Sequence, residues 1–205
     1  MQPMKKSAFD FGARRRGIGD RKAEEMLYRM NYDSPLGDIT VVSDGKNIVE
    51  LWLAGQRGFC RQPKGAEELE KKIPALAMAV RWLDRYFAGD RPTPDELPIA
   101  PVGGSFRQEV WKILRGIPYG EMMTYGEIAR RIADNRGIAK MAAQAVGGAV
   151  GHNPISIVIP CHRVVGTGGN LTGYGGGIAL KQALLAHEGV DLSGFYVPAK
   201  CGKKF

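Results

Sequence analysis

Long apolar runs are absent from this sequence, and its first residues do not show the pattern expected of a secretory leader. None of its 205 residues belongs to a stretch of about 18 consecutive apolar residues, the length that a membrane-spanning helix requires. Residues 1–25 are basic, but no apolar segment follows them, so they do not have the pattern of a signal peptide. We therefore expect a cytoplasmic protein that makes no contact with a membrane.

Cysteine is also scarce. Cys60, Cys161 and Cys201 form an odd set without CxxC spacing, which argues against a disulfide framework and against a structural zinc site. The three histidines fit no standard metal-ligand spacing either, so we expect no metal and no cofactor. Most free cysteines behave as small inert hydrophobic residues, and a special role for any of the three must be argued from its surroundings.

A phosphate-binding loop is missing too, while positive charge is in excess. Residues 167–177 are rich in glycine, but they do not end in Gly-Lys-Ser or Gly-Lys-Thr, so they do not predict a nucleotide site. The formal net charge is +8. This balance favours nucleic acid, an anionic membrane surface or an acidic protein as partner, although a solvated basic surface explains it equally well.

The first half of the chain predicts a small domain with one sheet and one helix. Residues 36–54 are rich in Val and Ile and contain Asp44-Gly45, which is typical of a β-hairpin turn. Residues 75–90 have apolar side chains at helical spacing, followed by a stop signal at Gly89. Four prolines and two glycines in 90–104 indicate a linker. We divide the chain into a basic segment 1–25, a first domain 26–90, a linker 91–104, a second domain 105–195 and a tail 196–205.

The second half predicts helices. Ser105 with Gln108, and Thr124 with Glu127, have the spacing of capping boxes ahead of helices over 106–115 and 125–133. A turn then leads to a helix of small residues over 140–152, which makes a helix-turn-helix candidate. Its adjacent glycines each cost about 1 kcal/mol in a helix interior, which indicates close approach of a nucleic acid or of another part of the protein.

A reactive group is predicted where an apolar run ends. The β-branched residues 155–160 indicate a buried strand, and Cys161, His162 and Arg163 follow it directly. Glu188 lies on the apolar stripe of a helix over 178–190, where a carboxylate requires a partner. These residues fit the logic of a thiol nucleophile, a base and a group that orients the base. A buried core cysteine with solvent-facing neighbours fits the same spacing.

The motif in this region resembles a known family. "PCHRVVG" at 160–166, Asn153-Pro154 before it and "GYGGG…K…LLAHEG" after it are similar to the O6-alkylguanine-DNA alkyltransferases. The resemblance covers residues 105–190 most closely. It implies an α+β fold, with an N-terminal ribonuclease-H-like antiparallel sheet domain and a C-terminal winged-helix-like helix-turn-helix domain. It also implies DNA repair by irreversible, single-turnover transfer of an alkyl group from O6-alkylguanine, and leaves O4-methylthymine open as a second substrate.

The resemblance assigns a role to each residue of the motif. Cys161 would accept the alkyl group, His162 would remove the thiol proton through a water, and Glu188 would polarise His162. Such a relay predicts a thiol pKa below about 8.5. Asn153 would brace the turn that carries the site, and Tyr125 would press on the phosphate of the target nucleotide, whereas Arg163 would be structural. The guanine pocket would be lined by Tyr174, Val164 and Gly175.

The resemblance also implies a partner, double-stranded DNA bound through its minor groove without sequence specificity by a monomer. The target base must leave the duplex to reach a buried thiol. Gln144 occupies the position where the family often has an arginine that fills the resulting gap, and glutamine supplies hydrogen bonds without a charge. The other expected DNA contacts on this helix are Ala143, Gly147, Gly148 and Gly151.

Three other functions compete with this interpretation. A non-catalytic lesion-binding protein would lack the reactive cysteine that this chain has at position 161. A DNA-binding transcription regulator would be expected to carry a sensor domain, and none is visible. A cysteine hydrolase would need an oxyanion hole, for which the sequence offers no pattern.

Overall fold

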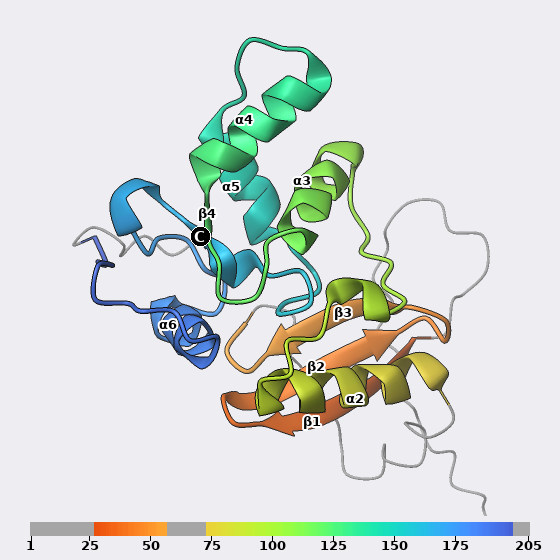
Figure 1. The fold of residues 1–205 in the computed structure, drawn as a ribbon. Coiled ribbons are helices and arrows are strands. Elements are labelled where there is room, and N and C mark those ends of the chain that lie inside the picture. The colour runs from red at the N-terminus through yellow and green to blue at the C-terminus, as the bar shows by residue number, and fades with distance from the viewer. Residues whose placement is uncertain (1–26, 57–72, 199–205) are drawn as a thin grey trace, which may run out of the picture.

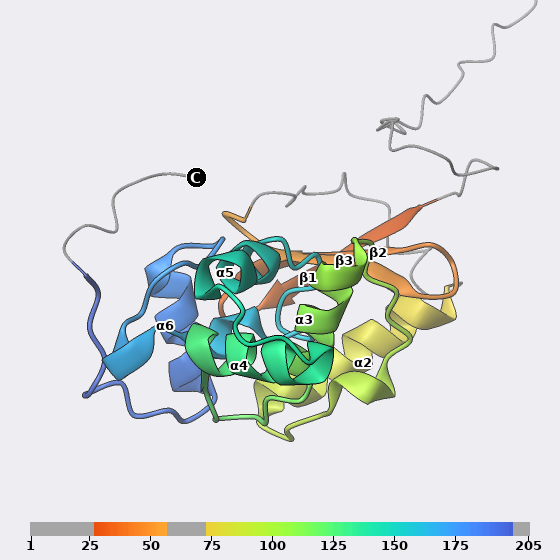
Figure 2. The ribbon, with the colours of Figure 1, turned by 90° about the horizontal axis from the view of Figure 1, so that it is seen from above.

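The computed structural model describes residues 27–56 and 73–198. In its N-terminal half, three antiparallel strands lie in the order β1 (Tyr28–Ser34), β2 (Gly37–Ser43) and β3 (Ile48–Leu53). Helix α2 (Pro74–Ala88) covers one face of this sheet (Figure 1, Figure 2). The N-terminal half is therefore a two-layer unit of one sheet and one helix.

The predicted β-hairpin over residues 36–54 is confirmed, because β2 pairs with β3. Its turn is shaped by the Asp44 carboxylate, which accepts hydrogen bonds from the backbone N–H groups of Lys46 (2.8 Å) and Asn47 (2.7 Å). Gly45 has a φ of +96°, a conformation in which a residue with a Cβ is strained. Asp and Gly therefore make the turn for different reasons.

Strand β1 was not predicted from the sequence. Met30 is its only fully buried residue, and the residues on either side of it are partly exposed. The strand pairs with β2 along its whole length, from Tyr28 opposite Ser43 to Ser34 opposite Gly37. Its apolar alternation is weak, so backbone pairing with β2 rather than a side-chain pattern determines its conformation.

The helix predicted over 75–90 is confirmed as α2, with bounds of 74–88. It ends at Gly89, which adopts a φ of +88° and donates its N–H to the carbonyl groups of Arg85 and Tyr86. Glycine commonly ends helices in this way. The buried residues of α2 are Ala75, Leu76, Ala79, Trp82, Leu83 and Tyr86.

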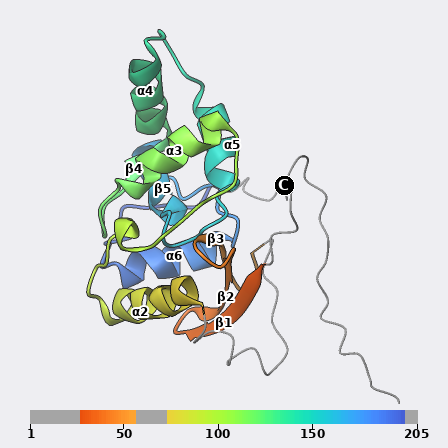
Figure 3. The same ribbon diagram turned by 90° about the vertical axis from the view of Figure 1, so that its right-hand side faces the viewer.

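The C-terminal half is mainly helical. After the short 3-10 helix η1 (Pro94–Glu96) come α3 (Ser105–Arg115), α4 (Tyr125–Arg136), α5 (Ala143–Gly151) and α6 (Ile178–His187). The 3-10 helices η2 (Cys161–Arg163) and η3 (Thr167–Gly169) lie between α5 and α6, and the two-residue strands β4 (Met123–Thr124) and β5 (Val164–Val165) pair in parallel. The loop between α4 and α5 lies at the tip of the molecule, far from the sheet (Figure 1, Figure 3).

Of the two predicted capping boxes, one is correct. The Thr124 hydroxyl accepts from the Glu127 N–H (3.1 Å), and the Glu127 carboxylate accepts from the Thr124 N–H (2.7 Å), as predicted for α4. The box at Ser105 is wrong, because Gly104 is the N-cap of α3 and Ser105 is already helical. Gln108 instead donates its side-chain amide to the carbonyl of Pro101, which removes it from the cap.

The predicted strand over residues 155–160 is also wrong. These residues are fully buried but form turns, with an isolated β-bridge at Ile155. Ile157 has a φ of +66°, which no extended strand allows. The β-branched run therefore reflects burial and not a strand, and Cys161 begins a 3-10 helix rather than following a sheet edge. The helix predicted over 178–190 likewise ends earlier, at His187, so Glu188 is its C-cap.

The two halves share one hydrophobic core. Buried residues of the sheet, α2, α3, α4, α5 and the 155–159 segment belong to a single contact cluster. The free edge of β3 binds the second half directly: Leu51 donates to the carbonyl of Pro154 (2.9 Å) and accepts from the N–H of Ser156 (3.0 Å). The sheet therefore holds the chain just before Cys161 in place.

Several predictions fall outside the described residues. They concern the basic segment 1–25, Cys60, Cys201 and most of the tail 196–205. The domain boundaries stay predictions. Among the described helices, none is long and apolar enough to cross a membrane.

Candidate active site

Asn153 holds the turn that carries the predicted nucleophile. Cys161 is 6% exposed at the start of η2. The side-chain amide of Asn153 donates to Ile159 O (2.7 Å) and to the Cys161 sulfur (3.1 Å), while its oxygen accepts from the N–H of Ile155 (3.1 Å). One buried side chain therefore fixes both ends of this irregular segment and supplies a donor to the sulfur.

His162 and Glu188 form the expected pair. Both are buried, and His162 Nε2 lies 2.7 Å from Glu188 Oε1. Because the carboxylate accepts, Nε2 carries the proton, and Nδ1 is left as the ring atom that accepts one. Nδ1 is buried and has no hydrogen-bond partner among the described residues. The alternative of a solvent-facing His162 and Arg163 is wrong, since both are buried.

Arg163 binds the same carboxylate, which the sequence did not indicate. Its Nε donates to Glu188 Oε2 (2.8 Å) and its Nη2 to Oε1 (2.9 Å), while Nη1 donates to Ile117 O (2.6 Å). The N–H of Gly120 also donates to Oε2 (3.1 Å). Glu188 is therefore a buried charge compensated by a fork-like ion pair, which is the condition under which such burial is tolerated.

The electrostatics of the pair favour a neutral imidazole and an ionised carboxylate. Burial acts to raise the pKa of Glu188, but the hydrogen bonds from His162 and Arg163 and the charge of Arg163 outweigh it and hold that pKa far below its usual value. Burial lowers the pKa of His162, and Glu188 offsets this only in part. His162 is thus able to accept a proton at neutral pH.

The predicted low thiol pKa is wrong for the free protein. Burial raises the pKa of Cys161, and the Asn153 hydrogen bond and the Lys181 charge offset burial only in part. Burial disfavours the thiolate more than these two groups favour it. The resting nucleophile is therefore a thiol.

The pairing of β4 with β5 brings Tyr125 close to the site. Met123 lies opposite Val164, so the chain that enters α4 runs beside the chain that leaves Cys161. Tyr125 donates its hydroxyl to Gly173 O (3.2 Å) in the glycine-rich loop. In the same loop, the hydroxyl of Tyr174 is buried and Gly175 is exposed. Burial raises the pKa of Tyr174 well above its ordinary value, and the nearby Cys161 adds to the shift.

Lys181, which belongs to the quoted motif, is a second residue to which the sequence analysis gave no role. It is fully buried, and its ammonium donates to the carbonyl groups of Val164 and Thr172. It therefore ties the glycine-rich loop to the chain that follows the nucleophile. A signal was available, because Lys181 shares a helix stripe with Glu188, at i and i+7.

The predicted DNA-contacting residues lie on an open face of α5. Ala143, Gln144, Gly148 and Gly151 are exposed, and Gly147 is half-buried. A Cβ at Gly148 or Gly151 would meet no atom within 4 Å, and one at Gly147 would only touch the Tyr125 ring at 3.9 Å. Close packing within the protein, one of the two explanations for these glycines, is therefore wrong. On its inner side, α5 is anchored by Trp111, whose indole donates to Ala149 O (2.9 Å).

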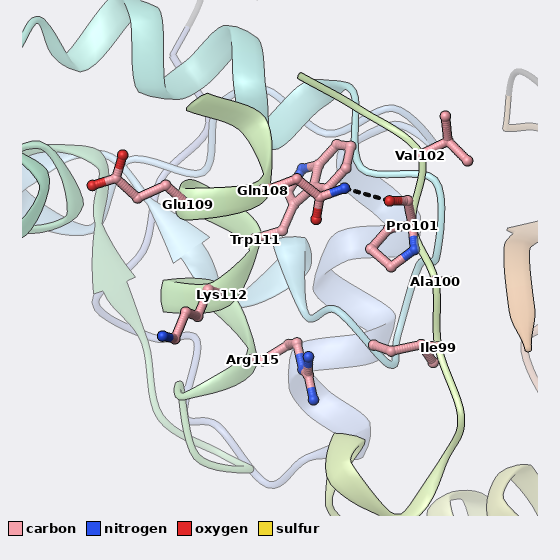
Figure 4. Close-up of a pocket in the computed structure, with 9 residues that line it drawn as sticks. All are labelled: Ile99, Ala100, Pro101, Val102, Gln108, Glu109, Trp111, Lys112 and Arg115. Atoms are coloured by element: carbon pink, nitrogen blue, oxygen red, sulfur yellow. Dashed lines mark hydrogen bonds between the residues drawn. The ribbon is translucent and has the colours of Figure 1, made fainter. Parts of the chain in front are cut away.

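A groove of about 790 Å³ lies elsewhere, between residues 99–102 and α3 (Figure 4). Trp111, Lys112 and Arg115 are among the residues of α3 that line it. None of the predicted site residues lines this groove, so it is separate from the thiol. Within residues 27–56 and 73–198, no group of three or more His, Cys, Asp and Glu residues could hold a metal ion.

Known protein families match both halves of the chain. Residues 105–190 match the family described as 6-O-methylguanine DNA methyltransferase, DNA binding domain, and residues 27–101 match its ribonuclease-like domain. A methylated-DNA–protein-cysteine methyltransferase of Haemophilus influenzae is 41% identical over 162 residues, which cover 79% of this chain and 86% of that protein. One of Mycobacterium bovis is 43% identical over 163 residues, covering 80% and 93%.

Solved structures are similar as well. Mycobacterium tuberculosis O6-methylguanine methyltransferase has a TM-score of 0.63 and 40% identity, over 85% of this chain and 97% of that one. A structure of Mycobacterium tuberculosis OGT in complex with DNA has a TM-score of 0.62 and 41% identity, over 78% and 92%. The predicted fold class is thereby confirmed, with a ribonuclease-like antiparallel sheet domain followed by a helical DNA-binding domain. The chain belongs to the 6-O-methylguanine DNA methyltransferase family.

Proposed function

We propose that this protein repairs O6-alkylguanine in DNA by moving the alkyl group onto Cys161, once per molecule. The sulfur attacks the alkyl carbon, a C–S bond forms, and the carbon–O6 bond breaks with its electron pair remaining on the guanine. The thiol proton leaves through His162, and the departing guanine takes up a proton. The product is restored guanine and an S-alkylcysteine, so the reaction is stoichiometric.

The observation that carries this proposal is the buried set of Cys161, Asn153, His162 and Glu188 inside a chain that matches the family over both halves. Glu188 keeps the proton on His162 Nε2, which leaves Nδ1 to accept the thiol proton directly or through a water. Because the pKa of the Cys161 thiol is raised, the sulfur is protonated in the free protein. In this proposal the thiolate forms once the substrate is present. An alkylated base that fills the site would meet a sulfur already aimed by Asn153.

DNA is the proposed partner of α5. Its exposed Gly and Ala residues let a helix approach the walls of a minor groove, and the net charge of +8 supports attraction to phosphates without sequence preference. Gln144 is proposed to enter the gap that a flipped base leaves. Tyr125 is proposed to press on the target phosphate, and Tyr174, Val164 and Gly175 to line the guanine pocket. We propose that the protein acts as a monomer.

The presence of Cys161 in a family site disfavours the competing functions. Lesion binding alone does not require the Cys161 thiol that accepts from the Asn153 amide. Transcription regulation does not require the buried His162–Glu188 pair.

The experiment that tests the proposal is intact-mass measurement after mixing with a duplex that contains one O6-methylguanine. We expect the mass to rise by one methyl group per protein molecule, located on Cys161. Cys161→Ala should abolish the transfer and leave DNA binding intact, since the phosphate contacts lie elsewhere. Methyl transfer to Cys60 or Cys201 in that variant would refute the assignment. An O4-methylthymine duplex tested in the same way decides whether that lesion is a substrate.

A further inference from the structure

A tyrosine of the N-terminal domain reaches the carboxylate that orients the proposed base. The hydroxyl of Tyr86, in α2, lies 2.8 Å from Glu188 Oε1, and the two residues are 102 positions apart in the chain. We propose that Tyr86 is a positioning residue for alkyl transfer, through which the N-terminal domain sets the strength of His162 as a base. This inference rests on the proposed transfer to Cys161.

The Tyr86 ring is held rigidly where this contact requires it. Tyr86 is fully buried. It stacks on Trp82 with ring centroids 5.5 Å apart, and it makes T-shaped contacts with Phe87 (5.1 Å) and Tyr119 (5.8 Å). Aromatic neighbours on several sides restrict the ring to one rotamer, so its hydroxyl is a fixed donor and not a transient one.

The direction of this hydrogen bond is settled by the two ionisation states. Burial raises the pKa of Tyr86 well above its ordinary value, and the charge of Glu188 adds to the shift, so the phenol stays protonated. The pKa of Glu188 lies far below its usual value, so the carboxylate stays ionised and only accepts. Tyr86 therefore donates to Oε1.

Oε1 is the oxygen on which the proposed base also depends. It accepts from His162 Nε2 (2.7 Å), Arg163 Nη2 (2.9 Å) and Tyr86 (2.8 Å). A carboxylate oxygen has two lone pairs, so three donors compete for them. Each donor withdraws electron density from Oε1 and thereby weakens the hydrogen bonds that Oε1 accepts from the other two donors.

Two consequences follow from this competition. Tyr86 limits how strongly Glu188 stabilises a protonated His162, and it holds Oε1 in line with Nε2. If Glu188 raised the pKa of His162 far enough, the imidazole would be protonated at neutral pH and could not accept the thiol proton. The N-terminal domain thus contributes one hydroxyl, from α2, to a site whose other residues lie in the C-terminal half.

The test is the pH dependence of the transfer rate with an O6-methylguanine duplex, measured between about pH 5 and pH 9. In Tyr86→Phe the ring packing stays and only the donor is lost. We expect the midpoint of the acidic limb, which reports the loss of the neutral base, to move upward by up to about one pH unit. Replacing Tyr86 by 3-fluorotyrosine, a stronger donor of the same shape, should move the midpoint downward.

Tyr119→Phe is the matched control. Tyr119 belongs to the same aromatic cluster, but its hydroxyl donates to the carbonyl of His187 (3.1 Å) rather than to Glu188, so its acidic limb should match that of the wild type. In a Glu188→Gln background, Tyr86→Phe should produce no further shift, because the two residues act through one contact.

The outcomes separate the two hypotheses. If the wild type transfers no methyl group, the proposed function fails and this role fails with it. If the wild type transfers and the midpoint is the same in Tyr86→Phe, in the fluorotyrosine protein and in Tyr119→Phe, Tyr86 only packs and the inference is overturned. A shift that persists in the Glu188→Gln background would also overturn it, since the effect would not pass through Glu188.

Discussion

At the scale of single residues, the site combines a resting thiol with a base that is already prepared. Asn153 and Lys181 lie near Cys161, yet burial dominates and raises the pKa of the sulfur. His162 is neutral and carries its proton on the side of Glu188. In the proposed mechanism, the thiol would therefore have to be deprotonated when the alkylated base is present.

This balance predicts the pH dependence of thiol alkylation in the free protein. The rate of reaction of Cys161 with iodoacetamide should rise with pH, with a midpoint above the ordinary thiol value of about 8.5. Peptide mapping after labelling measures Cys161 separately from Cys60 and Cys201. Asn153→Ala should raise the midpoint further, because the thiolate loses a donor. A midpoint below the ordinary thiol value would show that the surroundings of Cys161 favour the thiolate.

Removal of the Glu188 charge should slow alkyl transfer. In Glu188→Gln the carboxamide no longer stabilises a protonated imidazole, so His162 becomes a weaker base, and we expect a rate lower by about tenfold or more. The free energy of unfolding should fall as well, because the buried Arg163 loses its counter-ion. Single-turnover rates at a temperature where both proteins are folded measure the first effect.

Glu109→Gln is the control for that experiment. Glu109 forms an ion pair with Arg136 at the surface (2.8 Å), and such pairs contribute little. Its transfer rate should equal that of the wild type. Equal rates for Glu188→Gln and the wild type would remove Glu188 from the relay.

At the scale of single elements, α5 is built to leave one face open. Val146, Ala149 and Val150 are buried, while the face with Gln144 and Gly148 is exposed. Glycine in a helix interior costs stability, and the open space around Gly148 shows no gain for the protein alone. The glycines of α5 are therefore better explained by the proposed approach of DNA than by packing within the protein.

Gln144 should matter only where a base has to be flipped. Gln144→Ala should slow repair of duplex DNA, because nothing fills the gap in the stack, and should hardly change the reaction with free O6-benzylguanine. Gln144→Arg should tighten DNA binding at low salt and steepen the salt dependence by up to about 0.9 in the log–log slope, since it adds one phosphate-directed cation. Equal losses with the duplex and with the free base would assign Gln144 to the fold or the pocket instead.

At the scale of the whole molecule, the two halves fold around one core and one buried charge cluster. Leu51 and Tyr86 of the first half contact the 154–156 segment and Glu188 of the second. Unfolding of the first half would thus remove the Tyr86 donor from Glu188. The pH dependence of stability should report on His162 and Glu188 at once.

Acid should destabilise the protein from about pH 6.5 downward. The folded pKa of His162 lies below its unfolded value of about 6.5, so the unfolded state binds more protons and the free energy of unfolding falls as the pH drops through that window. Glu188, whose folded pKa is also lowered, adds a further loss below about pH 4.5. Tm measured from pH 7 to pH 5 should fall, and His162→Gln should flatten the decline. A wild-type Tm that stays constant would contradict the buried neutral imidazole.

The sequence by itself determined those features whose cause lies within a few residues. The helical spacing and the stop at Gly89 predict α2, the Thr124–Glu127 box predicts the start of α4, and Asp44-Gly45 predicts the turn of the hairpin. The motif at 160–166, together with "LLAHEG" downstream, indicated the family and the set of Cys161, His162 and Glu188. These signals act through backbone hydrogen bonds and side-chain periods that a short segment carries alone.

Only the tertiary structure decided the features that depend on distant partners. The apolar run 155–160 turns instead of extending, because β3 pairs with Ile155 alone and the Asn153 amide donates to the carbonyl of Ile159. Strand β1, the forked contact of Arg163 and the phenol of Tyr86 on Glu188 have no local signal. A buried carboxylate must be satisfied by whichever donors the fold brings to it, and here one of those donors lies 102 residues away in the chain.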